Sequence, residues 1–453
     1  MRATSDMSDY MFMLESRLSA DQNRVVSEVQ AAAAEANVSL FLAGGAMRDM
    51  LGGFPIRDLD FTIEGNAPKI AKAVAKKTHA QVIEDDEHRK LVELRFPGGV
   101  TAQIAMARRE RYAKPGGRPV VEPATIHEDL RGRDLTVNAV ALSLNRASRG
   151  LLIDPTNGLG DLERKELRAA YNYALYDNPA RILRLVRLRV RLGFTIDERT
   201  AQQYENVRLE QLENLIPPRR LMEELRHIAD DTNPGEVLRA FEEEKLLPLF
   251  SPALAGPKLN LAGFARLHKV RQLIPVGVRF PVENFGLFLD LLTEKLTPKE
   301  RAALMKAAAI PKADVDAWHK LEARSKKLER ELKSAKLTRP SHLYQVLSKA
   351  PGDQILFLLL RSQVRLAQDR IRNYLQKYLP MAQEVTDDEV RAKGVEPGTP
   401  KWDKAKEEVI AAKLNARPKK PAPEEVPPPG PQPPGPVPGG SLRRAYTRQP
   451  SAR

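Results

Sequence analysis

Cysteine is absent from the 453 residues of the chain. Its absence excludes disulfide bonds, thiolate zinc sites and cysteine nucleophiles, and it fits the reducing cytoplasm. No stretch of about eighteen apolar residues occurs, so no membrane-spanning helix is expected. The first fifteen residues include Asp6, Asp9 and Glu15 and lack the basic start and apolar stretch of a signal peptide. These absences lead us to expect a soluble, cytoplasmic protein.

Acidic residues are outnumbered by basic ones, 59 Asp and Glu against 73 Lys and Arg, which gives a formal net charge of +14. This excess indicates a polyanionic partner, with nucleic acid as the leading candidate and an anionic membrane surface as the weaker one. A basic tail on an otherwise neutral protein would give the same total charge. The chain of 453 residues is too long to fold around a single compact hydrophobic core, so we expect about two to four domains or subdomains.

Short apolar runs alternate with helical spacings over the first 150 residues, which predicts a domain of mixed strands and helices. The predicted strands cover 38–43, 59–63, 80–83, 90–96 and 101–106, and the predicted helices cover 10–36, 46–51 and 67–78. From residue 179 onward strand signals almost vanish, and the helical spacing predicts a nearly all-helical half. Residues 418–440 are rich in proline and glycine, so we expect them to be disordered, followed by a basic tip at 441–453.

Two aspartates, Asp58 and Asp60, open the second predicted strand. Side chains at i and i+2 of a strand project to the same face, so the two carboxylates lie side by side. Such hard oxygen ligands suit Mg²⁺, which keeps part of its coordination for substrate phosphates. Two such ions can activate an attacking RNA 3′-hydroxyl and stabilise a leaving pyrophosphate. Alone, however, an Asp-x-Asp sequence is more often a solvated turn or a cap than a metal site.

A glycine pair, Gly44 and Gly45, ends the preceding predicted strand. Glycine has no Cβ, so backbone N–H groups there can approach a triphosphate closely. A glycine pair by itself usually marks only a turn. The combination is far more specific: a glycine pair at a strand end is followed by a basic loop and then by Asp58 and Asp60 at the start of an apolar strand. This order favours a nucleotidyl-transfer site in which the two aspartates are the catalytic, metal-binding residues.

These residues and four later segments resemble, in order, the motifs of the class II CCA-adding enzyme and poly(A) polymerase family of RNA nucleotidyltransferases. The segments are 44–49 with 58–60, 129–139, 154–162, 177–184 and 220–225. The resemblance implies an α+β head domain, with a nucleotidyltransferase-like mixed sheet and helices, followed by an all-helical neck, body and tail. It also implies Mg²⁺ as cofactor and template-independent addition of CMP and AMP, from CTP and ATP, to the 3′ end of tRNA or another RNA.

The same resemblance assigns roles to individual residues. The implied nucleotide-binding residues are Gly44, Gly45, Arg48, Arg133, Asp134, Asn138, Asn178, Arg181 and Arg184. Among these, Arg133, Asp134 and Asn138 would set the ribose, and Asn178 with Arg181 the base. From the spacing itself, Arg181, Arg184, Arg187 and Arg191 fall on one face of a helix, and we expect Arg187 and Arg191 to bind RNA. A salt-bridged helix face is the alternative interpretation.

Three departures from the family pattern bear on activity. Gln103 stands where relatives commonly carry a third carboxylate near the metals, and a neutral amide contributes no charge. Asn178 replaces an aspartate of the base-recognition motif, and it offers both an acceptor and donors, so we expect relaxed or weakened base choice. Gly132 replaces the first of two arginines in the ribose-selecting motif.

The expected organisation is a helical lead-in at 1–36, a nucleotidyltransferase head at 37–165, a neck for base recognition and RNA binding at 166–255, a helical body and tail at 256–416, and a disordered basic tail at 417–453. The sequence leaves CCA addition, A-tailing and partial addition open, and it does not indicate an oligomeric state. A catalytically weak relative that acts as an RNA-binding protein is the alternative from another class.

Overall fold

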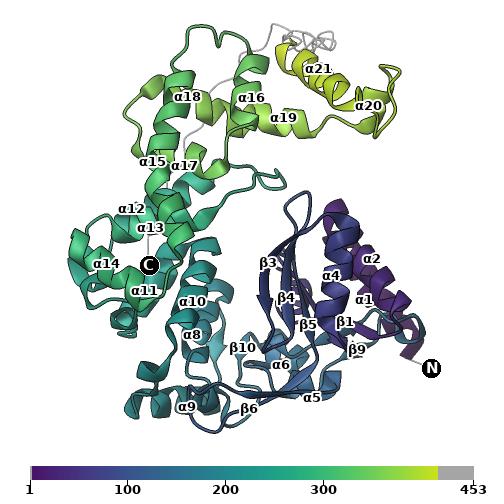
Figure 1. Cartoon of the computed structure of the whole chain (residues 1–453), viewed down its shortest axis with the longest axis vertical. Coiled ribbons are helices and arrows are strands. Elements are labelled where there is room, and N and C mark those ends of the chain that lie inside the picture. The colour runs from purple at the N-terminus through teal and green to yellow at the C-terminus, as the bar shows by residue number, and fades with distance from the viewer. Residues whose placement is uncertain (1–2, 417–453) are drawn as a thin grey trace, which may run out of the picture.

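The computed structural model describes residues 3–416 of the chain, as a head, a neck and a helical body (Figure 1). The strands are β1 (Ser39–Ala43), β2 (Leu59–Glu64), β3 (Gln81–Asp86), β4 (Leu91–Arg95), β5 (Thr101–Met106), β6 (Arg108–Arg111), β7 (Val120–Pro123), β8 (Ala141–Ser143), β9 (Leu152–Ile153), β10 (Glu166–Leu167) and β11 (Thr195–Ile196). The expected proline-rich segment and basic tip lie outside the described residues.

The helices of the first half are α1 (Ala3–Arg17), α2 (Ala20–Glu35), α3 (Gly45–Gly52), α4 (Ala67–Thr78), α5 (Ile126–Arg131), α6 (Gly158–Arg164), α7 (Ala174–Asp177), α8 (Arg181–Leu192), α9 (Glu198–Leu209), α10 (Pro218–Asp230) and α11 (Pro234–Glu243). Those of the second half are α12 (Leu261–Arg271), α13 (Asn284–Thr293), α14 (Pro298–Ala307), α15 (Lys312–Leu332), α16 (Pro340–Ser348), α17 (Gly352–Arg361), α18 (Arg365–Asn373), α19 (Leu379–Gln383), α20 (Asp387–Arg391) and α21 (Trp402–Asn415). The α+β head and the largely helical remainder confirm the expected fold class, although the expected all-helical neck also contains the short parallel pair β10–β11.

Seven strands of the head form one sheet in the order β3-β4-β5-β2-β1-β8-β9. The central β2 and β5 run parallel, and every other neighbouring pair is antiparallel. Helices α1, α2 and α4 lie on one side of this sheet (Figure 1). Their apolar side chains form a core with alternate residues of β1, β2, β4 and β5. Side chains at the other alternate positions therefore face the neck, and this open face carries the site.

Local signals explain the edges of the head helices. Ser19 caps α2 by accepting from the Gln22 backbone N–H, and the Gln22 side chain accepts in turn from the Ser19 N–H, which completes a capping box. The expected lead-in helix therefore divides into two. Asn66 caps α4 by accepting from the backbone N–H of Lys69 at 3.1 Å. The α4 bounds agree with those expected from the sequence. The β6–β7 ribbon, in contrast, was not expected from the sequence.

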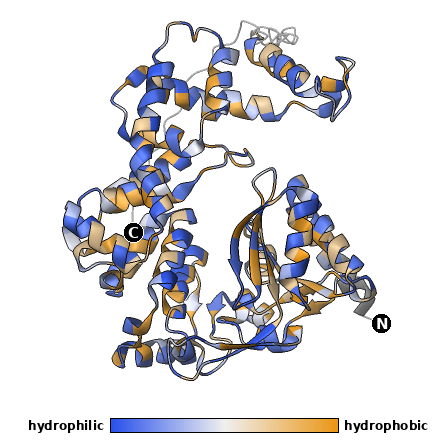
Figure 2. Ribbon diagram, in the orientation of Figure 1, coloured by the Kyte–Doolittle hydropathy of each residue, from blue (hydrophilic) through white to orange (hydrophobic). Residues whose placement is uncertain are grey.

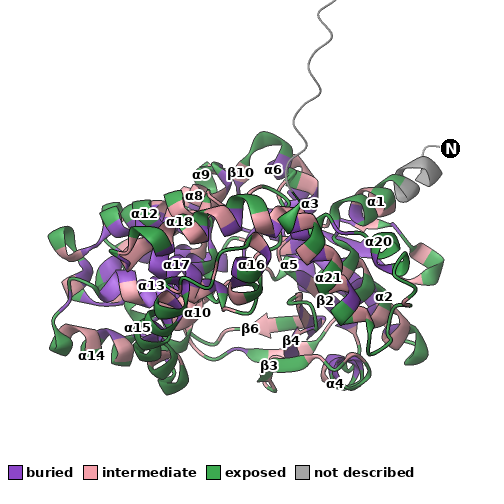
Figure 3. Ribbon diagram, turned by 90° about the horizontal axis from the view of Figure 1, so that it is seen from above, coloured by how far each residue is buried: buried purple, intermediate pink, exposed green. Residues whose placement is uncertain are grey.

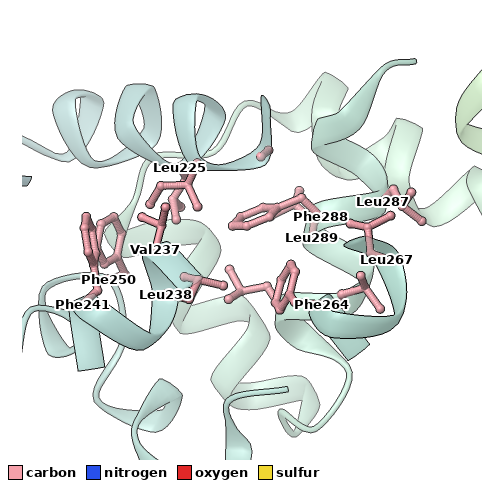
Figure 4. Packing of buried hydrophobic residues seen from close by; sticks show 14 of the residues in the cluster. Leu225, Val237, Leu238, Phe241, Phe250, Phe264, Leu267, Leu287, Phe288 and Leu289 are labelled. Atoms are coloured by element: carbon pink, nitrogen blue, oxygen red, sulfur yellow. The ribbon is translucent and has the colours of Figure 1, made fainter. Parts of the chain in front are cut away.

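The neck and the body share one hydrophobic core that runs from Leu135 to Leu379. Helix α8 buries its apolar side chains in it, and Figure 4 shows the part of the core around Leu225, Phe241 and Phe288. Hydrophobic residues follow the strands of the sheet and the packed helices (Figure 2), whereas peripheral helices such as α4 and α14 carry exposed residues outward (Figure 3). No helix within residues 3–416 is long and apolar enough to cross a membrane. The domain boundaries expected from the sequence stay a prediction.

Candidate active site

The two aspartates lie at the start of β2, on the open face of the sheet. Leu59 and Phe61 alternate with them and point into the helix-covered core, which fixes the direction of the carboxylates. Asp58 Oδ1 accepts a hydrogen bond from Thr101 Oγ1 on β5. Asp60 Oδ2 accepts one from the backbone N–H of Gly45 at 2.9 Å. The carboxylates are therefore side by side, as the sequence predicts.

The glycine pair is needed because Asp60 lies so close to it. Gly44 has φ of 72°, and a Cβ there would lie 2.9 Å from Asp60 Oδ2 and 3.0 Å from Arg133 Nη1. A Cβ on Gly45 would lie 3.2 Å from the same oxygen. The close backbone approach that the sequence assigns to a triphosphate is thus used by the side chain of Asp60. A triphosphate contact of Gly44 and Gly45 stays a prediction.

The charge on the aspartate pair suits a divalent cation. Burial raises the pKa of Asp60, and the neighbouring Asp58 raises it further, against the opposing charges of Arg133 and Arg48. Two carboxylates that repel each other at one edge of a strand are a hard oxygen donor set of the kind that Mg²⁺ takes. No three His, Cys, Asp or Glu side chains already converge on one point in residues 3–416. A divalent cation at this site would be held by the carboxylate oxygens of Asp58 and Asp60.

A hydrogen-bonded network joins four further predicted residues, Arg48, Asn138, Asp134 and Arg184. Arg48 Nη1 donates to Asn138 Oδ1 at 2.8 Å, and Asn138 Nδ2 donates to Asp134 Oδ1 at 3.1 Å. Arg184 Nη1 completes the chain with a bond of 2.7 Å to Asp134 Oδ2. Burial alone would raise the pKa of Asp134, but Arg184, Arg181 and the hydrogen bonds to the carboxylate together hold that pKa below its usual range. Residues from three distant segments thus meet as one ionised network.

Arg133 connects this network to the metal-binding face. Its Nη2 donates to Thr62 Oγ1 on β2 at 3.0 Å, and its Nη1 donates to the backbone carbonyl of Asn138 at 3.2 Å. Asp129 anchors the guanidinium through two further bonds of 3.0 and 2.9 Å. Arg133 is therefore held in place between the aspartate pair and the predicted ribose-setting residues.

Arg181 is oriented by groups that the sequence does not single out. Its guanidinium lies over the Tyr171 ring at 5.6 Å and donates to Tyr171 Oη at 3.0 Å. Nη2 donates to the backbone carbonyl of Gly132 at 3.0 Å. Gly132, which stands where the family carries an arginine, therefore supports Arg181 through its backbone carbonyl. A Cβ at Gly132 would come no closer than 3.5 Å to a neighbour, so nothing there demands glycine.

Asn178 lies beside a short relay of polar groups. Asn178 Nδ2 is 3.5 Å from Tyr112 Oη, and Tyr112 in turn donates to Glu110 Oε2 at 2.7 Å. Burial raises the pKa of the Tyr112 hydroxyl well above its usual range, and the charge of Glu110 adds to the rise, so Tyr112 keeps its proton. In this arrangement Nδ2 faces the tyrosine, and Oδ1 is left as an acceptor. Tyr112 and Glu110 are thus supporting residues that the base-recognition motif alone does not reveal.

The structure corrects the expectation for the outer pair of helix arginines. Arg187 is buried and forms an ion pair with Glu224 of α10. Arg191 Nη2 donates to Asp49 Oδ2 at 2.7 Å, and its side chain is 14% exposed. Both guanidinium groups are held by carboxylates within the fold, so they are not an open surface for RNA. The salt-bridged face, which the sequence left as the alternative, is what the structure contains.

Glu93 on β4 is a further acidic residue near the pair that sequence reasoning missed. Burial raises its pKa to about 7, and the charges of Asp58 and Glu84 add to the rise. The signal that could have found it is its alternation with Val92 and Leu94, which both point into the core.

The head of the chain is similar to a known protein domain. A family model described as the poly A polymerase head domain matches residues 40–168, which span the aspartate pair, Arg133 and Asn138. This match covers the head, and residues 169–453 lie outside it. The similarity of this region agrees with the resemblance that the motifs in the sequence indicate.

Curated proteins are similar to this chain over part of their length. The A-adding tRNA nucleotidyltransferase of Aquifex aeolicus is 29% identical over 74% of this chain and 40% of its own length. The CC-adding tRNA nucleotidyltransferase of Deinococcus radiodurans is 37% identical over 34% of this chain and 41% of its own length. The chain therefore spans less than half the length of these curated relatives.

Among solved structures, a CCA-adding enzyme in an apo form is similar with a TM-score of 0.51 and 22% identity, over 92% of this chain and 96% of that one. At this identity the likeness concerns the fold, and it supports the arrangement of a mixed head and a helical remainder.

Proposed function

We propose that the chain transfers nucleotides from nucleoside triphosphates to the 3′ end of RNA, with tRNA as the substrate class. The observation that carries the proposal is the pair Asp58 and Asp60, placed beside Gly45 on the open face of a poly A polymerase head domain. The names of the relatives favour tRNA over other RNA. A reaction of this kind fits the expected cytoplasmic location, which stays a prediction.

In the proposed reaction, the RNA 3′ oxygen attacks the α-phosphorus of the nucleotide, and the bond to pyrophosphate breaks in line. Asp58 and Asp60 would hold Mg²⁺, which when bound supplies positive charge at the attacking and leaving oxygens. Arg133, fixed by Asp129 and Thr62, would face the substrate phosphates or ribose next to the pair. Asp134 and Asn138, ordered by Arg184, would set the ribose. Preorganised groups of this kind cost no rearrangement during the reaction.

The proposal is tested by incubating the chain with Mg²⁺, tRNA that lacks its 3′ terminus, and each nucleoside triphosphate in turn. Extension by one or more nucleotides supports the transferase. Tight tRNA binding without any extension would instead support the RNA-binding alternative, to which Gln103, Gly132 and Asn178 lend some weight. The pattern of additions would separate CCA addition from A-tailing and from addition of only C or only A.

Base choice gives a second prediction. Asn178 can accept the exocyclic amine of CTP or ATP through Oδ1, but it carries no charge to repel the carbonyl oxygen of UTP or GTP. We expect Asn178→Asp to improve discrimination against UTP and GTP by about tenfold, the effect of roughly one hydrogen bond to a charged group. Single-turnover rates with all four nucleotides measure it. Strict C and A addition by the unmodified chain would contradict the prediction.

Gly132→Arg is the matched control for this change. It adds the missing family charge next to Arg181 without touching the amide at 178, and the space around Gly132 admits a side chain. We expect it to alter rates with the four nucleotides in parallel and to leave their ratios unchanged.

A further inference from the structure

The open face of the sheet carries one more carboxylate in line with Asp60. The register pairs Asp60 on β2 with Gln103 on β5, and Gln103 in turn with Glu93 on β4. Ala102 and Ile104 on β5, like Val92 and Leu94 on β4, point into the helix-covered core. Asp60, Gln103 and Glu93 therefore form one cross-strand row on the face that bears the site.

Glu93 has no compensating partner in this row. Its carboxylate makes no hydrogen bond or ion pair within residues 3–416. Arg95, whose charge acts on Glu93, forms an ion pair of 2.8 Å with Glu283 of the body. Glu84, which pairs with Glu93 across β3 and β4, is bound by Arg219 of α10. Within residues 3–416, Glu93 thus has neither an ion pair nor a hydrogen bond, whereas Asp58 accepts from Thr101 and Asp60 from the Gly45 N–H.

An unpaired, half-buried carboxylate beside Asp58 and Asp60 destabilises the fold unless a cation offsets the repulsion. Each of these three negative charges lies on the same face, and the middle position of the row, Gln103, is neutral. The arrangement therefore leaves an excess of negative charge that spans the strands next to the aspartate pair.

We propose that Glu93 supplies the third negative charge of the metal site. Glu93 lies on β4, one strand further from Asp60 than Gln103, whose neutral amide supplies no charge. This inference rests on the proposed function, because it concerns the divalent cation held by Asp58 and Asp60. Two strand spacings, roughly 10 Å, separate the backbones of Asp60 and Glu93. This separation suits a contact between Glu93 and a water on the ion, and Mg²⁺ usually keeps several waters. Glu93 is in this sense a positioning residue.

The test is the affinity of the full chain for Mn²⁺, titrated by electron paramagnetic resonance without nucleotide or RNA. We expect Glu93→Gln to weaken Mn²⁺ binding by about tenfold, the low end for residues that support metal ligands through hydrogen bonds. The control is Glu87→Gln, which removes the same charge from the exposed turn of the β3–β4 hairpin and should leave the affinity unchanged. Because Glu93→Gln relieves repulsion, it should not lower the melting temperature of the metal-free protein.

A charge-transposed variant makes the test more specific. Glu93→Gln combined with Gln103→Glu moves the third carboxylate one strand closer to Asp60, and we expect it to recover the lost affinity. Equal Mn²⁺ affinity of Glu93→Gln and the unmodified chain would overturn the inference, as would an unmodified chain that binds no Mn²⁺.

The result is separable from the proposed function. Extension of tRNA by the unmodified chain, together with unchanged Mn²⁺ affinity in Glu93→Gln, would refute the role of Glu93 and leave the transferase standing. Weaker Mn²⁺ binding in Glu93→Gln, without extension by the unmodified chain, would support the role of Glu93 and refute the transferase.

Discussion

Replacing Asp60 with asparagine should reduce RNA extension by about a thousandfold or more, since a metal-held charge contributes several kcal/mol to transition-state stabilisation. The same change should leave the melting temperature of the metal-free protein unchanged or higher. The folded-state pKa of Asp60 is raised by burial and by Asp58, so its ionised form costs stability at pH values above that pKa. Asparagine keeps an oxygen for the Gly45 N–H bond and removes the charge.

Single-turnover extension of tRNA and thermal unfolding in the presence of a chelator measure the two effects. The matched control is Asp85→Asn, which removes a carboxylate that pairs with Lys72 on the outer surface of the head. It should leave both the rate and the melting temperature nearly unchanged. Extension by Asp60→Asn at the rate of the unmodified chain would refute the catalytic role of the aspartate pair.

Replacing Asp49 with alanine should destabilise the fold by about 3–5 kcal/mol, the range for removal of one partner from a buried ion pair. Asp49 Oδ1 accepts from Arg48 at 2.7 and 2.8 Å, and its Oδ2 accepts from Arg191. Burial and the charges of Arg57 and Arg48 lower the pKa of Arg191 to about 10, so this guanidinium depends on its carboxylates. Without Asp49, two buried arginines would repel each other between head and neck.

Thermal and urea unfolding, followed by circular dichroism, measure this loss. Asp388→Ala is the matched control, because it removes a carboxylate from an exposed ion pair with Arg391 in the short helix α20 and should have little effect. Extension activity should fall as well, because Arg48 also orients Asn138. Equal stability of the Asp49 and Asp388 variants would contradict a structural role for the ion pairs of Asp49 with Arg48 and Arg191.

Local patterns were sufficient to predict β1, β2 and α4, because each contains its own hydrophobic period and its own end signals. The alignment of the two aspartates on one face was also predictable, since it depends on residues next to each other in the chain, whereas the contact of the glycine pair with Asp60 was not. The partners of these residues were not. Thr101 reaches Asp58 only because β5 lies beside β2, and no pattern within either segment specifies this neighbour.

The helix arginines show the same limit. The spacing of Arg187 and Arg191 correctly placed them on one face of α8, but it could not reveal that Glu224 and Asp49 cover this face. These acids come from segments about 40 residues later and 140 residues earlier. Glu93 was missed for a related reason, since its position next to Gln103 depends on strand register. The periodicity of a sequence identifies which side chains share a face of a helix or strand, whereas tertiary packing determines which residues contact that face.

The sheet order has a consequence for how the chain folds during synthesis. β1 and β2 pair early, but the other edge of β1 pairs with β8, so that Phe41 lies opposite Ser143. Until residue 143 has left the ribosome, β1 is exposed as a sheet edge, and β8 then remains an edge until β9 emerges; such edges promote wrong pairing. At about 5–20 residues per second, this interval lasts several seconds. The head is therefore most vulnerable to aggregation before its last two strands emerge.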